Sequence, residues 1–107
     1  TGKPSEYGIS WTTDRFCREN DIQFVAVTTP IPINTLQAYS DNYNAAWKYF
    51  GQYFDEHEVT YLNFNTQYFK AFSHDLSDYT DFDGHMNGNA AKEYSKVLAN
   101  ILKGEGV

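Results

Sequence analysis

The sequence predicts an α/β fold in which helices alternate with strands that run parallel. Two segments, 22–28 and 59–64, are rich in β-branched and aromatic residues. The first is almost continuously apolar, which is typical of a strand buried on both faces of a parallel sheet. Strands joined by crossover helices are expected to be parallel, with helices on both faces of the sheet. Because two strands make a thin sheet, we expect further strands to lie upstream in a longer protein.

Composition indicates one unit over residues 1–107, with residues 1–9 as a loosely structured leading segment. The chain has 41% hydrophobic and 18% aromatic residues, enough for a core rich in aromatic rings. A net charge of -6 disfavours binding to nucleic acid, and no apolar run approaches the roughly 20 residues needed to span a bilayer. The start lacks an initiator Met and a signal-peptide core, so we expect it to fall in mid-sequence.

The first half of the chain contains a short helix, a strand and a long helix. Ser10 or Thr12 is the expected cap of a helix that runs to about Asn20. The strand 22–28 follows, and two prolines end it. The next helix is expected to have Asn34 or Thr35 as its cap. Its apolar face follows from spacings of three and four residues and consists of Leu36, Tyr39, Tyr43, Ala46, Phe50 and Tyr53.

The second half begins with the strand 59–64 and ends with an amphipathic helix. Residues 65–72 are expected to form one or two helical turns, and residues 73–85 a long polar loop. The last helix begins after this loop, with Asn87 or Asn89 as its cap, and ends at Lys103-Gly104. Loops that follow strands of open α/β sheets are where functional sites gather, so the 73–85 loop is the expected place for chemistry.

Four interpretations of this acidic loop compete. Its aspartates (Asp75, Asp78, Asp81 and Asp83) could form an irregular calcium site, although an EF-hand register would put Tyr79 and Ala90 at ligand positions. Zinc could bind His74, His85 and one Asp, with His57 available elsewhere, but the spacing matches no zinc motif. A solvated surface loop is the plain alternative. The fourth interpretation is a catalytic pair, in which a carboxylate orients a general-base histidine.

The catalytic interpretation gains weight from a family resemblance. Phe82-Asp83-Gly84-His85-Met86-Asn87, followed by Ala90-Ala91 and an amphipathic helix, resembles the C-terminal block of SGNH (GDSL-type) hydrolases. Residues 16–30, a helix and strand that end in proline, are similar to another segment of that family. The resemblance covers about residues 10–103. It is nearest to the branch of bacterial cell-surface acyl-transfer and O-acetylation proteins.

The resemblance implies part of a flavodoxin-like three-layer α/β/α sandwich and a Ser–His–Asp triad that needs neither metal nor cofactor. His85 would be the general base and Asp83 its orienting acid, with Asp81 as the competing acid. It also implies an acyl-ester substrate, such as an acetylated cell-envelope carbohydrate, and a parent protein at the bacterial surface or outside the cell.

This chain also departs from the family pattern. Ala90 stands where the family has Gly, and the Gly-Asp-Ser nucleophile and the oxyanion-hole blocks are absent. We therefore expect the C-terminal portion of an esterase or O-acyltransferase that is inactive alone. The alternative is a non-catalytic α/β module that binds carbohydrate or protein, with a calcium site in the acidic loop.

Overall fold

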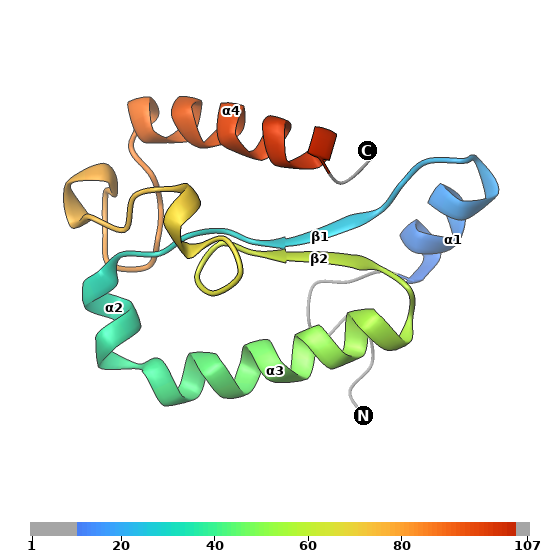
Figure 1. Cartoon of the computed structure of the whole chain (residues 1–107), viewed down its shortest axis with the longest axis horizontal. Coiled ribbons are helices and arrows are strands. Elements are labelled where there is room, and N and C mark those ends of the chain that lie inside the picture. The colour runs from blue at the N-terminus through green and yellow to red at the C-terminus, as the bar shows by residue number, and fades with distance from the viewer. Residues whose placement is uncertain (1–10, 105–107) are drawn as a thin grey trace.

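The computed structural model describes residues 11–104, which form a mixed α/β structure (Figure 1). In chain order its elements are helix α1 (Trp11–Glu19), strand β1 (Val25–Thr28), helices α2 (Ile33–Ala38) and α3 (Ser40–Glu56), strand β2 (Thr60–Asn63), the short 3-10 helices η2 (Phe69–Ala71) and η3 (Leu76–Asp78), and helix α4 (Gly88–Gly104). The predicted order of helices and strands is confirmed.

The two strands pair in parallel, as predicted, with Val25 opposite Thr60 and Thr28 opposite Asn63. Figure 1 shows α3 along one side of this pair and α4 along the other. The carboxyl ends of both strands point toward the end of the molecule that holds α2 and the loop before α4.

Each side of the sheet has its own hydrophobic cluster, because successive residues of a strand face opposite ways. On the α3 side, Ala26, Phe54 and Val59 are buried, and partly buried rings of α3 and the strands pack against them. On the α4 side, Leu62, Phe64 and Tyr94 are buried, and Val25 and Val27 of β1 pack against them. The apolar run of the first strand is thus explained by contacts on both faces.

The predicted long helix is wrong in one respect, because the chain breaks into α2 and α3 at Tyr39. This residue has φ -129° and ψ 31°, and its side chain is 58% exposed, so it does not belong to the buried face. The break carries neither Gly nor Pro, so no local signal marks it. α2 begins after Pro32 without a side-chain cap, so the predicted caps Asn34 and Thr35 are wrong and both lie inside the helix.

The remaining helix ends fit the sequence more closely. Asn87 caps α4, since its Oδ1 accepts a hydrogen bond from Ala90 N at 2.9 Å. Thr12 lies inside α1, and Ser10 is outside the described residues. Arg18 of α1 donates to His57 O at 2.9 Å, which fixes α1 to the end of α3. Within residues 11–104, no helix combines the length and apolar character needed to cross a membrane.

Candidate functional site

The loop before α4 closes into a tight turn. Tyr79 and Met86 form an isolated antiparallel bridge, and Thr80 N donates to His85 O at 2.6 Å. The Thr80 hydroxyl donates to the same carbonyl at 3.0 Å. Within the predicted long loop, these contacts join the two ends of the segment 80–85 and close it into a turn.

Asp81 organises this turn through both of its carboxylate oxygens. Oδ1 accepts hydrogen bonds from Asp83 N at 2.9 Å and from His85 N at 3.3 Å. Oδ2 lies 2.5 Å from His85 Nδ1. Among the described residues, the Asp83 carboxylate makes no hydrogen bond or ion pair. The structure therefore brings together His85 and the competing acid Asp81, and it does not bring together His85 and the first-choice acid Asp83.

The pairing leaves the outer nitrogen of the ring available. An Nδ1–H that donates to Asp81 fixes the tautomer in which Nε2 of a neutral imidazole carries the lone pair. The side chains of His85 and Asp81 are 74% and 40% exposed. Desolvation opposes ionisation of Asp81. Hydrogen bonds from the His85 ring and from the His85 and Asp83 amides outweigh it and hold the Asp81 pKa below its ordinary value. The His85 ring is thus held at Nδ1 by Asp81, while most of its side chain is exposed.

Contacts with the segment after β1 fix the position of the turn. Gly84 has φ +101°, a conformation that favours glycine, and it lies against Ile31 and Pro30. On the other side of the turn, the Thr35 hydroxyl donates to Phe82 O. The pair is thereby held beside the carboxyl end of β1, where sites of open parallel sheets are found.

Asn65, which the sequence did not single out, holds the end of the sheet together. It is buried, its Oδ1 accepts from Ile31 N at 3.0 Å, and its Nδ2 donates to Thr29 O at 2.9 Å. The amide thus satisfies two backbone groups of the segment against which the turn packs. Asn65 stands in the largely polar run 63–67, so no local signal distinguishes it in the sequence.

His74 has a structural position. The ring is buried, with Nδ1 2.8 Å from Ile31 O and Nε2 3.0 Å from Phe69 O. It also stacks on the Phe69 ring, with centroids 4.1 Å apart and an interplanar angle of 9°. Because both ring nitrogens face backbone carbonyls, His74 joins the chain after β1 to the chain after β2.

The metal alternatives lack a suitable set of ligands. Within residues 11–104, no three side chains of His, Cys, Asp or Glu converge where they could hold an ion. His74 is engaged with carbonyls, and His57 lies at the far end of α3 from the acidic loop. Two of the loop's aspartates instead bind local backbone amides: Asp75 accepts from Ser77 N at 2.9 Å, and Asp81 accepts from Asp83 N at 2.9 Å.

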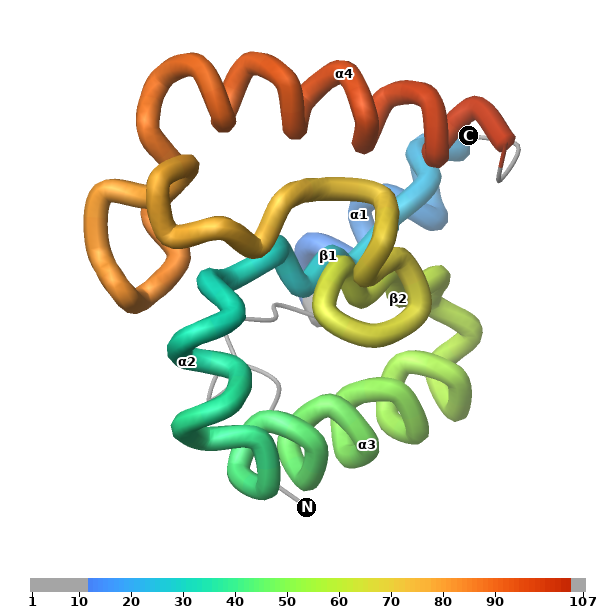
Figure 2. The backbone as a smooth tube through the Cα atoms, turned by 60° about the vertical axis from the view of Figure 1, so that its left-hand side comes forward, coloured from blue at the N-terminus to red at the C-terminus, as the bar shows by residue number. Residues whose placement is uncertain are grey.

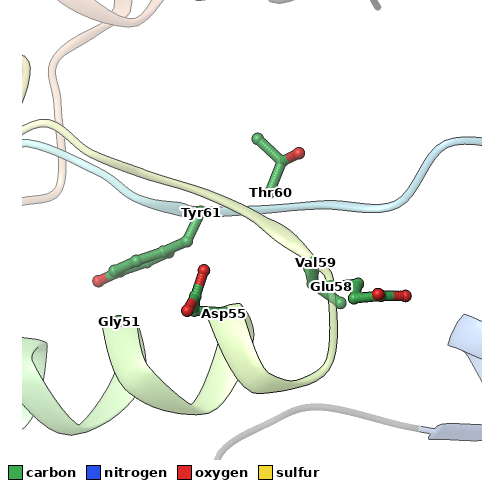
Figure 3. Close-up of a pocket in the computed structure, with 6 residues that line it drawn as sticks. All are labelled: Gly51, Asp55, Glu58, Val59, Thr60 and Tyr61. Atoms are coloured by element: carbon green, nitrogen blue, oxygen red, sulfur yellow. The ribbon is translucent and has the colours of Figure 1, made fainter.

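A hollow of about 440 Å³ lies at the other end of β2 from His85 (Figure 3). It opens between α3 and the start of β2, and two of its side chains are acidic. Its lining residues are Gly51, Asp55, Glu58, Val59, Thr60 and Tyr61. This hollow is remote from the His85 turn, so it adds nothing to the chemistry there.

No described serine completes a triad with His85. The hydroxyl of Ser95 donates to Ala91 O, one turn back in α4, at 2.9 Å. Among residues 11–104, no serine hydroxyl forms a hydrogen bond with the His85 ring, and Ser10 lies outside the described part. The chain has no significant match among protein-family models, curated proteins or solved structures.

Proposed function

We propose that this chain is the C-terminal portion of an SGNH-like esterase or O-acyltransferase domain. His85 would be its general base and Asp81 the acid that orients it. The observation that carries the proposal is the 2.5 Å contact between Asp81 Oδ2 and His85 Nδ1, with Nε2 left open. Asp83, the first-choice acid on sequence grounds, would only supply a backbone N–H to the turn.

The sheet supports the flavodoxin-like part of the proposal. Its strands are parallel and have a helix on either side, as such a sandwich requires. Within residues 11–104, each strand has one unpaired edge, so further strands could extend the sheet. Upstream sequence would supply those strands, the nucleophilic serine and the oxyanion donors.

The chemistry assigned to the pair is proton transfer. His85 Nε2 would take the proton of the serine hydroxyl as its oxygen attacks the ester carbonyl, and the carboxylate of Asp81 would stabilise the imidazolium. The proton would then pass to the leaving alcohol, and water or an acceptor alcohol would release the acyl group. By the resemblance, the substrate is an acyl ester such as an acetylated cell-envelope carbohydrate. Without a hydroxyl and an oxyanion hole, this chain alone is expected to be inactive.

A serine-directed fluorophosphonate probe tests the proposal. It should label the longer parent protein and leave the 107-residue chain unlabelled. In the parent, His85→Ala should lower kcat for p-nitrophenyl acetate by on the order of 10²–10⁴. Asp81→Asn should also lower it, and the matched control Asp83→Asn should not. Labelling of the short chain would overturn the proposal, and an unlabelled parent would favour the non-catalytic binding module.

A further inference from the structure

A second hollow lies on the side of α2 and α3 that faces the segment after β2. Its volume is about 400 Å³, within the range of about 300–1,000 Å³ typical of small-molecule sites. Figure 2 shows α2 and α3 meeting at an angle, with the segment after β2 on their inner side. Two aliphatic residues of α2 form part of the wall, and the other lining residues are Gln37, Ser40, Asn44, Trp47, Asn65 and Phe69.

The lining of this groove is uncharged, although the whole chain carries a net charge of -6. A charged ligand would find no opposite charge there, so the groove suits a neutral one. Among the described residues, the side-chain amides of Gln37 and Asn44 make no hydrogen bond. They are exposed and therefore free to donate to and accept from a ligand.

Each of the two aromatic rings that line the groove stacks on a neighbouring ring. The Trp47 indole stacks on Tyr43, with centroids 5.3 Å apart and an interplanar angle of 22°. Phe69 stacks on the buried His74 ring. Asn65 is already bonded to backbone, which fixes the wall that it contributes. Rigid rings beside free amides offer a flat apolar surface and hydrogen-bonding groups at low cost in conformational entropy.

We propose that this groove binds a neutral saccharide unit. The C–H face of a sugar would pack on Trp47, while its hydroxyls would exchange hydrogen bonds with Gln37 and Asn44. A purely apolar ligand fits less well, because it would cover these amides without satisfying them. The inference goes beyond the proposed acyl transfer and does not depend on it. The groove and the His85 turn are neighbouring sites, because the Thr35 hydroxyl of α2 donates a hydrogen bond to Phe82 O in that turn.

Tryptophan fluorescence can follow binding to the groove. The chain has two tryptophans, so Trp11→Phe leaves Trp47 as the only one. Titration of this variant with cellotetraose and with N-acetylchitotetraose should give a saturable change in emission for at least one of them, and calorimetry should give the same Kd. Tetragalacturonate, which is anionic, should give no change. Absence of saturation with both neutral sugars, or a response to tetragalacturonate alone, would overturn the proposal.

Substitutions locate the binding. Asn44→Ala and Gln37→Ala lie on exposed helix surface and should each raise Kd by about tenfold. Gln52→Ala, an exposed amide of the same helix α3 outside the groove, is the matched control and should leave Kd unchanged. His85→Ala should also leave it unchanged, which separates this site from the proposed esterase chemistry. Equal Kd values for Asn44→Ala, Gln37→Ala and Gln52→Ala would refute the assignment.

Discussion

Gly84→Ala should destabilise the protein and disturb the His85 turn. A Cβ at this position would lie 2.7 Å from Ile31 Cγ2, which is closer than two non-bonded carbon atoms approach each other. In addition, the residue has φ +101°. The backbone conformation alone should cost about 1–2 kcal/mol for a residue other than glycine. Crowding against buried Ile31 should add about 1–3 kcal/mol. We therefore expect the free energy of unfolding to fall by about 2–5 kcal/mol.

Gly51→Ala is the matched control, and its expected effect has the opposite sign. Gly51 lies inside α3, and a Cβ there would meet nothing within 4 Å. Because alanine favours helix over glycine, the free energy of unfolding should rise by about 0.5–1 kcal/mol. Urea denaturation followed by circular dichroism measures both variants. If Gly84→Ala were as stable as the wild type while Gly51→Ala gained stability, the described turn and its contact with Ile31 would be wrong.

Further substitutions test the groups that hold the loop and the core. Asp81→Asn should flatten the loss of stability at acid pH, measured by acid denaturation. The hydrogen bonds that Asp81 accepts hold its folded-state pKa below its ordinary value, so the ionised carboxylate stabilises the fold above that ordinary value, and this stabilisation is lost as the pH falls through the folded-state pKa. A wild-type acid profile in Asp81→Asn would contradict this role. Tyr94→Phe should raise the free energy of unfolding by about 1 kcal/mol in urea, because the buried Tyr94 hydroxyl has no partner among the described residues. Burial raises the pKa of Tyr94 from 10 to about 12, so the wild type should lose more stability than Tyr94→Phe as pH rises from 10 to 12. Asn65→Leu should cost about 2–4 kcal/mol in the same urea assay, because it removes a buried amide that satisfies two backbone groups; an unchanged midpoint would contradict that role.

Much of the fold could be predicted because its determinants are local. The parallel strands follow from two apolar, β-branched segments separated by a helical pattern, and Asn87 marks the start of α4. The break at Tyr39 could not be predicted, because the helical spacing of apolar residues continues through it. The change of direction between α2 and α3 allows a tertiary contact, because the Thr35 hydroxyl of α2 donates to Phe82 O in a loop far along the chain.

The sequence indicated which loop holds the candidate site, but not which aspartate contacts His85. The sequence put Asp83 first and left Asp81 as the competing acid, and only the geometry of the turn distinguishes them. The positive φ of Gly84 directs the chain so that the His85 ring and amide both face Asp81. The supporting residues Asn65 and His74 act on backbone groups of a distant segment, and no sequence pattern reports such contacts.

Because the side chains of His85 and Asp81 are exposed, the His85 ring is expected to contribute little to the stability of the fold. Exposed ion pairs add little to stability, and the turn is held without the His85 ring, by the Gly84 packing, the Thr35 hydroxyl and the Tyr79–Met86 bridge. His85→Ala should therefore shift Tm by no more than about 3 °C. Differential scanning calorimetry measures the shift, and the backbone amide signals of residues 80–84 in NMR spectra report whether the turn persists. A large fall in Tm would make His85 a structural residue. An unchanged Tm, together with lost activity in the parent protein, would leave proton transfer as the reason for its position.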